Sequence, residues 1–150
     1  MAIERVAVIG AGEWGTALAQ AAATAGRQVM LIGRDPEVLA DINRKLRNSK
    51  HLGSQKLSQH ISASSRYSGA DLVILAVPAQ ATRNALAALG PLGEPVVLTA
   101  KGLEHGTLQR QSEILAEMAP NAVPFVLSGP SFASDVAAGR PTAVTLAGQY

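Results

Sequence analysis

A chain of 150 residues with 47% hydrophobic and 16% charged residues has the composition of an ordinary soluble globular domain, which excludes a disordered chain. The net charge of only +2 and the 3% content of aromatic residues exclude a basic, base-stacking surface, so no nucleic-acid partner is expected. The chain has no cysteine, which excludes disulfides and thiolate chemistry. It has no apolar stretch of the ~20 residues needed to span a membrane. Because it also has no signal-peptide pattern, a cytoplasmic location is expected.

The first informative segment is a glycine-rich turn, Gly10-Ala11-Gly12-Glu13-Trp14-Gly15. It follows an apolar run that predicts a strand over Val6–Ile9 and precedes an alanine-rich stretch that predicts a helix over Thr16–Ala25. In a dinucleotide-binding fingerprint, Gly10 permits a tight turn, Gly12 lets the backbone approach a pyrophosphate, and Gly15 lets the helix pack on the strand. The N–H groups and positive dipole end of the helix would face the phosphates. The turn therefore predicts a dinucleotide site, and the alternative is a structural strand–turn–helix without a ligand.

Further apolar runs alternate with helical stretches along the rest of the chain. Several are continuous runs of Val, Leu and Ile, as in parallel strands buried on both faces. This alternation predicts an α/β fold of the Rossmann type in one domain, residues 1–150: a doubly wound, mostly parallel sheet with helices on both faces. The later strands are expected at Gln28–Ile32, His60–Ala63, Asp71–Val77, Pro95–Thr99, Val123–Leu127 and Ala143–Leu146.

Several helix boundaries carry residues suited to capping. Asp35-Pro36-Glu37 predicts an N-cap, a proline at the first helical position and an acidic first turn. Gly26 and Gly90 follow alanine-rich helices at places where a left-handed conformation is needed.

One more amphipathic helix is expected before Pro120, and two connections are expected to be irregular. The apolar face of that helix is outlined by Leu108, Ile114, Leu115 and Met118. The polar stretch from Asn48 to Gln59 lacks periodicity and predicts a loop, and the connection Ser64–Gly69 is short for a full helix.

The end of the second expected strand, Ile32-Gly33-Arg34-Asp35-Pro36, bears on the choice between NAD and NADP. In this fold an acidic residue here hydrogen-bonds the ribose 2′-OH, whereas an arginine accommodates a 2′-phosphate. Asp35 is placed for NAD by counting, but as a helix N-cap its carboxylate would be occupied by backbone N–H groups. Gly33 leaves space for the ribose, and Arg34 offers a planar, charged guanidinium group suited to phosphate. NADP, or use of both cofactors, is therefore favoured; NAD alone and a purely surface role for Arg34 are the alternatives.

Three later segments bear on the substrate. The buried strand that ends at Pro78 points its carboxyl end into the crevice where ligands bind in open α/β sheets. Lys101 follows the next strand, where its ammonium group can meet a phosphate or carbonyl oxygen. The segment Ser128-Gly129-Pro130-Ser131-Phe132-Ala133 joins another strand to an expected helix, whose N-terminal amides can bind an anion.

Together these segments resemble the N-terminal half of NAD(P)-dependent glycerol-3-phosphate dehydrogenase over nearly the whole chain. The residues that carry the resemblance are Gly10–Ala17, Val77-Pro78, Lys101-Gly102-Leu103, Ser128–Ala133 and Gly139–Ala143. The resemblance implies an oxidoreductase that interconverts dihydroxyacetone phosphate and sn-glycerol 3-phosphate by hydride transfer with NAD(P)H, supplying glycerol 3-phosphate for phospholipid synthesis. It places the general-base lysine and most substrate-phosphate ligands in a helical second domain absent from this chain. The chain alone is thus expected to bind dinucleotide with little or no turnover, and the full-length protein to be a homodimer.

The resemblance also implies roles at matching positions. Cofactor contacts are implied for Gly10, Gly12, Glu13, Trp14, Gly15, Arg34, His51, Pro78, Lys101 and Ala133, with Glu13 acting through its backbone. Substrate contacts are implied for Lys101, Gly129 and Ser131, and neither a metal site nor a catalytic residue is expected in this chain. The alternatives are packing alone for Trp14, a solvated surface position for Lys101 and helix capping for Ser131.

The chain departs from the family pattern at two places. His51-Leu52-Gly53-Ser54 stands where a Tyr-Leu-Pro-Gly-like loop is usual, so His51 replaces an aromatic residue near the cofactor, and Asp135 replaces a glutamate. Two other functions stay open: a related two-domain dehydrogenase of the ketopantoate reductase or hydroxyacid dehydrogenase type, and a dinucleotide-sensing module without catalysis. The segment Ser128–Ala133 argues against the first, and Lys101 and Ser131 argue against the second, because neither is needed to cradle a pyrophosphate.

Overall fold

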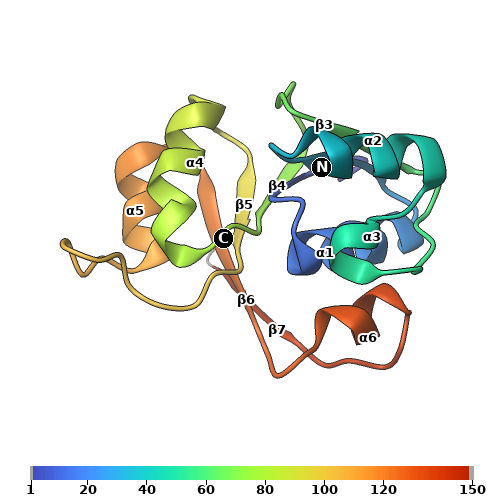
Figure 1. The fold of residues 1–150 in the computed structure, drawn as a ribbon. Helices are drawn as coiled ribbons and strands as arrows, with labels where there is room; N and C mark the ends of the chain where they lie inside the picture. Colours follow the sequence, from blue (N-terminus) through green and yellow to red (C-terminus); the bar gives the residue numbers. More distant parts are fainter. Residues whose placement is uncertain (1, 149–150) are drawn as a thin grey trace.

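A computed structural model describes residues 2–148, which form a seven-stranded sheet in the order β3-β2-β1-β4-β5-β6-β7 (Figure 1). The first six strands are parallel, and β7 pairs antiparallel with β6. The expected doubly wound, mostly parallel fold is confirmed. The strand order reverses between β1 and β4, which is where ligands bind in such sheets. The strands are β1 (Arg5–Ile9), β2 (Gln28–Ile32), β3 (Ile61–Ser64), β4 (Leu72–Leu75), β5 (Pro95–Leu98), β6 (Val123–Ser128) and β7 (Thr145–Gly148).

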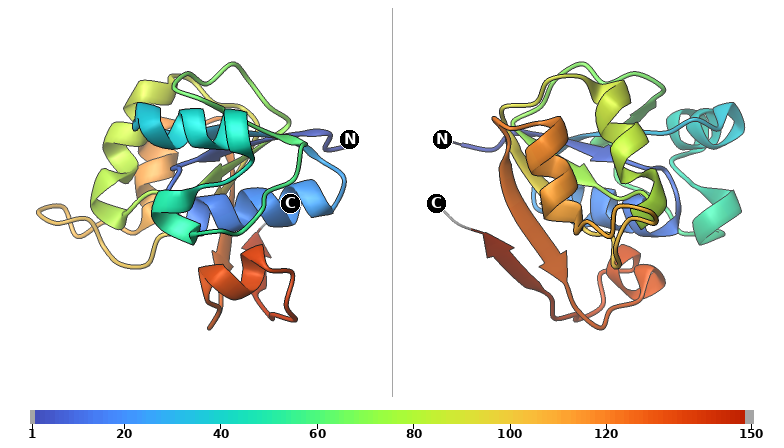
Figure 2. Two further views of the ribbon diagram at one scale, coloured as in Figure 1. Left: turned by 45° about the vertical axis from the view of Figure 1, so that its right-hand side comes forward. Right: turned by 90° about the vertical axis from the view of Figure 1, so that its left-hand side faces the viewer.

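Helices cover both faces of this sheet. Helices α1 and α2 lie on one face and α4 and α5 on the other, while α6 packs against α1 beside the β6–β7 edge (Figure 2). No helix within residues 2–148 has the length and apolar character needed to cross a membrane. The helices are α1 (Glu13–Thr24), α2 (Pro36–Lys45), α3 (Ser49–Leu52), the short 3₁₀ helix η1 (Ala79–Ala81), α4 (Thr82–Leu89), α5 (Gln111–Met118) and α6 (Ala133–Ala137).

Strand β1 shows why the apolar runs of the sequence do not alternate with polar residues. Val6 and Val8 belong to the core under α1 and α2, whereas Ala7 and Ile9 belong to the core under α4 and α5. Successive side chains of a strand point to opposite faces, and both faces are covered here. The buried positions of a central strand must therefore be apolar on both faces, and in β1 only the exposed first residue, Arg5, is charged.

The expected helix boundaries are confirmed at three positions. The Asp35 carboxylate accepts a hydrogen bond from the Glu37 N–H at 3.0 Å, which makes it the N-cap of α2. Gly26 and Gly90 have φ angles of 83° and 78°, the positive values expected after α1 and α4.

Helix α1 begins at Glu13, three residues before the predicted start. The last glycine of the glycine-rich turn therefore lies inside the first turn of the helix. This earlier start places the helix N-terminus directly at Gly12.

Two other predictions of local structure are wrong. The stretch expected to be a loop contains the short helix α3, which Asn48 begins by accepting hydrogen bonds at its carbonyl oxygen from the N–H groups of His51 and Leu52. Leu108 does not belong to α5: it is 71% exposed and has a φ of 58°. It lies in a turn closed by the Leu108 N–H to Glu104 carbonyl bond, and α5 begins only after Arg110.

The last strand lies two residues later than expected, at Thr145–Gly148, and all four of its residues are exposed. The chain returns from α6 to the sheet edge and packs Ala143 and Val144 beside Gly129 before pairing begins. The ends of the other strands lie within two residues of their predicted positions.

Candidate functional site

The glycine-rich turn between β1 and α1 is tight because its first glycine adopts a positive φ. Gly10 has a φ of 112°, and its N–H donates to the Ile32 carbonyl oxygen at 2.8 Å. A Cβ atom at this position would lie 2.4 Å from the Ala76 carbonyl oxygen. The predicted role of Gly10 in the turn is confirmed, since another residue would be strained and would clash.

The other two glycines of the turn differ from each other. A Cβ on Gly15 would lie 1.8 Å from the Gly10 carbonyl oxygen, so this glycine allows α1 to pack on the end of β1, as predicted. A Cβ on Gly12 would meet no atom within 4 Å. Packing within the protein thus does not require a glycine at position 12. The absence of a side chain there leaves the backbone of the turn open to an approaching group.

The N-terminus of α1 is suited to an anion. Gly12 is its N-cap and supplies no side-chain hydrogen bond to the N–H groups of the first turn. Such N–H groups, together with the positive end of the helix dipole, bind phosphate groups. The open space at Gly12 and the uncapped helix fit the pyrophosphate of a dinucleotide.

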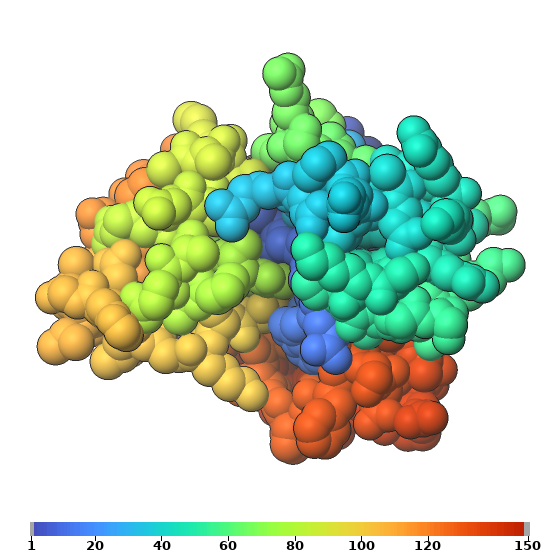
Figure 3. All heavy atoms as spheres, viewed as in Figure 1, coloured from blue at the N-terminus to red at the C-terminus, as the bar shows by residue number. Residues whose placement is uncertain are grey.

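A cavity of about 730 Å³ opens beside this turn, at the carboxyl ends of β1, β2 and β4 (Figure 3). Figure 3 shows the hollow between the yellow-green atoms of α4 and the cyan atoms that follow β2. Five of the predicted cofactor residues line this cavity: Gly10, Gly12, Arg34, His51 and Pro78. Its size suits a small-molecule ligand, and its position is the switch point of the sheet.

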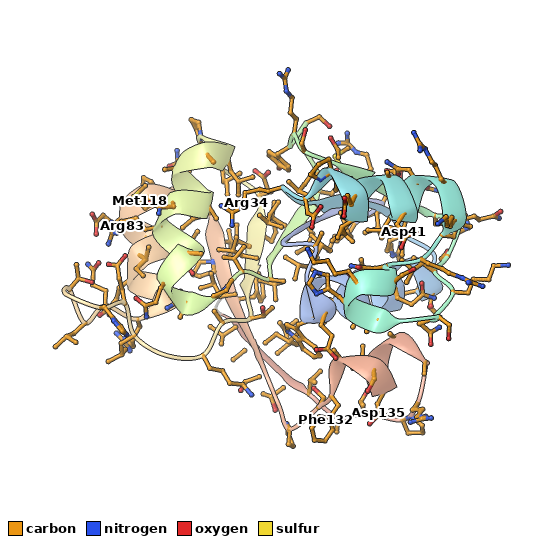
Figure 4. All side chains as sticks on the ribbon, in the orientation of Figure 1. Arg34, Asp41, Arg83, Met118, Phe132 and Asp135 are labelled. Atoms are coloured by element: carbon orange, nitrogen blue, oxygen red, sulfur yellow. The ribbon has the colours of Figure 1, made fainter. Side chains whose placement is uncertain are left out.

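Two arginine side chains lie at the end of the cavity near β2. Arg34 projects there (Figure 4), and Arg66, which follows β3, lines the same cavity. The second oxygen of Asp35 accepts a hydrogen bond from Lys50 Nζ at 2.6 Å, while the first caps α2. The Lys50 ammonium group, aided by the Glu37 N–H, holds the pKa of Asp35 below its usual value. Both carboxylate oxygens are thus engaged: one by a backbone N–H group, as the N-cap interpretation of Asp35 predicted, and the other by Lys50, which the sequence did not predict.

The predicted substrate residues form a second cluster outside this cavity. Lys101 Nζ donates to the Gly129 carbonyl oxygen at 3.5 Å, and the Ser131 N–H donates to the same oxygen at 3.1 Å. The Ser131 hydroxyl oxygen is buried and has no hydrogen-bond partner within residues 2–148. Ser131 does not cap α6, whose N-cap is Phe132 without a side-chain bond, so the capping alternative is wrong.

The remaining predicted cofactor residues do not line the cavity. Glu13 is exposed in the first turn of α1, and Trp14 is partly buried against the core under α1 and α2. Ala133 begins α6, beside the second cluster.

Side chains from η1, α4 and α5 hold the segment that follows Lys101. The Gln80 side chain makes two hydrogen bonds to this segment: it donates to the Leu103 carbonyl oxygen at 2.9 Å and accepts from the His105 N–H at 2.8 Å. Gln111 donates to the Gly102 carbonyl oxygen at 3.0 Å. Arg83, beside Met118 in Figure 4, makes two bonds of 2.9 Å to the Glu104 carboxylate. Lys101 is therefore attached to an anchored segment rather than to a free loop.

The Arg83–Glu104 pair gives a testable dependence of stability on pH. The Arg83 guanidinium, with the Thr107 hydroxyl, lowers the pKa of Glu104 from 4.5 to about 2. Because the carboxylate form is favoured in the folded state, its contribution is complete above pH 4.5 and is lost as the pH falls toward 2. We expect E104Q to be less stable than the parent at neutral pH and to lose less stability over this range, as measured by urea unfolding. Parallel stability curves for the two proteins would contradict this assignment.

The sequence interpretation missed three residues at or beside the cavity. Arg66 and Tyr67 follow β3, so the rule that ligands bind at the carboxyl ends of parallel strands could have found them. The Tyr67 hydroxyl donates to the Glu94 carboxylate, and burial together with this bond raises the pKa of Tyr67. Asn48 is fully buried against the glycine-rich turn, and no local pattern marked it within a stretch expected to be a loop.

The fold and the glycine-rich turn define a Rossmann-type domain of the dinucleotide-binding class. Residues 5–150 match the family described as NAD-dependent glycerol-3-phosphate dehydrogenase N-terminus. The chain belongs to this family.

Relatives with curated names agree with this family. The chain is 48% identical over 150 residues to the glycerol-3-phosphate dehydrogenase [NAD(P)+] of Brucella canis, covering 95% of this chain and 46% of the relative. It is also 48% identical to the protein of the same name from Parvibaculum lavamentivorans, covering 98% and 46%. A crystal structure of glycerol-3-phosphate dehydrogenase from Coxiella burnetii superimposes with a TM-score of 0.85 at 27% identity, over 96% of this chain and 46% of that one. The chain thus spans about half the length of these relatives.

Proposed function

We propose that this chain is the dinucleotide-binding part of an NAD(P)-dependent glycerol-3-phosphate dehydrogenase, which interconverts dihydroxyacetone phosphate and sn-glycerol 3-phosphate. The observation that carries the proposal is the open approach at Gly12 beside the uncapped N-terminus of α1. The names of the relatives support the reaction and the use of NAD(P). A cytoplasmic location, a homodimeric full-length protein and supply of glycerol 3-phosphate for phospholipid synthesis belong to the same proposal.

The dinucleotide would be held along the cavity and the turn. Gly10, Gly12 and the backbone N–H of Glu13 would face the pyrophosphate, and Arg34 would face the adenosine ribose. Pro78 and His51 would border the bound molecule, since both line the cavity. When bound, the nicotinamide ring accepts or donates the hydride.

The substrate would lie at the second cluster. The Lys101 ammonium group would donate hydrogen bonds to a phosphate or carbonyl oxygen, and Gly129 and Ser131 would border the same molecule. The buried, unpartnered hydroxyl oxygen of Ser131 supports this assignment, because buried polar atoms without a partner are rare. We assign the proton-transferring lysine to a helical second domain, and we therefore expect the 150-residue chain to bind dinucleotide with little or no turnover.

We propose further that the site prefers NADP to NAD. Both oxygens of the Asp35 carboxylate are engaged, so this residue is poorly placed to accept a bond from a ribose 2′-OH. Arg34 and Arg66 both line this end of the cavity and suit the charge of a 2′-phosphate.

Calorimetric titration of the chain with NADPH and NADH tests both parts of this proposal. We expect tighter binding of NADPH in the parent and a loss of about 10- to 100-fold in NADPH affinity in R34S, because a charge-assisted hydrogen bond to the phosphate is removed. NADH affinity should change by less than about twofold, since the 2′-OH carries no charge. R27S is the matched control, because Arg27 is an exposed arginine that follows α1 at the opposite end of β2. A parent that prefers NADH would overturn the NADP preference, and a parent that binds neither would overturn the proposed function.

A further inference from the structure

Within residues 2–148 one asparagine is fully buried: Asn48, whose side chain contacts the glycine-rich turn from the start of α3. We propose that Asn48 is a positioning residue for dinucleotide binding. Its side chain holds two carbonyl groups of the turn and thereby directs the N–H groups of Gly12 and Glu13 toward the place of the pyrophosphate. This inference rests on the proposed dinucleotide function and adds a residue from outside the fingerprint.

The hydrogen bonds determine how the Asn48 amide is oriented. Its Nδ2 donates to the Ala11 carbonyl oxygen at 3.1 Å and to Thr16 Oγ1 at 2.8 Å. Thr16 Oγ1 in turn donates to the Gly12 carbonyl oxygen at 2.7 Å, so toward Asn48 this hydroxyl can only accept. Both groups that face Asn48 are acceptors, and only its NH₂ group satisfies them.

These bonds orient the N–H groups because a trans peptide is planar. The carbonyl of Ala11 and the N–H of Gly12 belong to one peptide and point in opposite directions, as do the carbonyl of Gly12 and the N–H of Glu13. Asn48 holds the first carbonyl directly and the second through Thr16. The two N–H groups are thereby fixed at the point where the turn opens into the cavity.

The burial of Asn48 argues against a role in stability alone. Its side chain has no exposed surface, and its Oδ1 has no hydrogen-bond partner within residues 2–148. An unpartnered buried acceptor destabilises a protein, so an apolar residue of similar size would suit the fold better. The bonds from Nδ2 to the turn therefore account for the asparagine better than core packing does.

Two ligands separate positioning from general stability. ADP-ribose contains the adenosine half and the pyrophosphate, whereas adenosine 2′-monophosphate lacks the pyrophosphate. For N48A in the 150-residue chain, we expect about tenfold weaker binding of ADP-ribose by calorimetry, and a change of less than about twofold for adenosine 2′-monophosphate by NMR titration. Equal losses for both ligands, or no loss for either, would overturn the inference while leaving the proposed function in place. A parent chain that binds neither ligand would overturn both.

Variants of Thr16 keep the test valid if N48A does not fold. T16V preserves the volume of the side chain but removes the hydroxyl that relays the bond to Gly12, and it should weaken ADP-ribose binding severalfold. T16S keeps that hydroxyl and should restore the parent affinity. Failure of T16S to restore binding would contradict the relay.

Asn43 provides the matched control. Its amide group also makes two bonds to the backbone, donating to the Ala63 carbonyl oxygen and accepting from the Ala63 N–H, both at 2.8 Å. It connects α2 to β3 rather than to the glycine-rich turn. N43A should lower the unfolding midpoint and leave the affinity for ADP-ribose unchanged. Weaker ADP-ribose binding in N43A, matching N48A, would contradict the positioning role.

Discussion

Substitution of Gly15 by alanine is expected to destabilise the protein by about 3 kcal/mol or more, although alanine normally stabilises a helix relative to glycine. A Cβ at this position would lie 1.8 Å from the Gly10 carbonyl oxygen and 3.3 Å from the Ala76 Cβ. The clash is with the backbone of a tight turn, and Gly15 is buried, so α1 cannot move away without separating from β1 and β4. Urea unfolding followed by circular dichroism measures the loss directly.

Gly26 is the matched control for the packing argument. Its Cβ would meet no atom within 4 Å, but its φ of 83° makes alanine moderately strained there. We therefore expect G26A to cost about 1 kcal/mol, clearly less than G15A. A G15A protein as stable as the parent would show that the turn is looser than this structure describes.

The second large effect is expected for G12A, and it concerns binding rather than stability. Gly12 has a φ of −81° and free space where a Cβ would be added, so the free energy of unfolding should change by less than about 0.5 kcal/mol. The added methyl group would occupy the approach to the first N–H groups of α1. We expect the affinity for NADPH to fall about 100-fold, since two or more charge-assisted hydrogen bonds would be lengthened or lost. Calorimetric titration of a variant with unchanged unfolding measures this loss.

An unchanged NADPH affinity in G12A would contradict the proposed position of the pyrophosphate. The comparison with G15A is informative because the two glycines lie in the same turn. Gly15 is required by the packing of the protein, whereas Gly12 would be required by the approach of a ligand. Only a ligand that binds at the turn would make G12A lower the affinity for NADPH while G15A lowers the stability of the protein.

The fold could be predicted from the sequence because the signal is regular along the chain. A parallel sheet covered on both faces requires apolar residues at successive buried positions of its strands, and such runs are visible without tertiary information. Capping also depends on local chemistry, which is why Asp35 was correctly expected to begin α2. The strand ends were less accurate because they depend on where neighbouring chains stop pairing.

The wrong predictions concern residues whose conformation depends on distant contacts. Leu108 matched a helical spacing, but the turn between Glu104 and Gln109 holds it outside α5. The helix α3 is only four residues long and has no apolar periodicity to reveal it. It lies over the glycine-rich turn because Asn48 reaches residues about thirty-five positions earlier in the chain.

The candidate site was predicted in two parts that the structure keeps separate. The glycine-rich turn and Arg34 line one cavity, and Lys101 with Gly129 and Ser131 forms a second cluster. Sequence motifs identified both because strand ends and glycine turns carry local signals. The distance between them could not be predicted, since it depends on how β4, β5 and β6 are arranged across the sheet.

The central claim is that a dinucleotide binds at the glycine-rich turn with its pyrophosphate on the N-terminus of α1. Titration of the ¹⁵N-labelled chain with NADPH, followed by amide NMR signals, tests this claim most directly. The account predicts the largest shifts at Gly12 and Glu13, further shifts at Arg34, and none at Glu117 in α5. The absence of any shift on addition of NADPH, or shifts confined to residues outside the turn and its cavity, would contradict it.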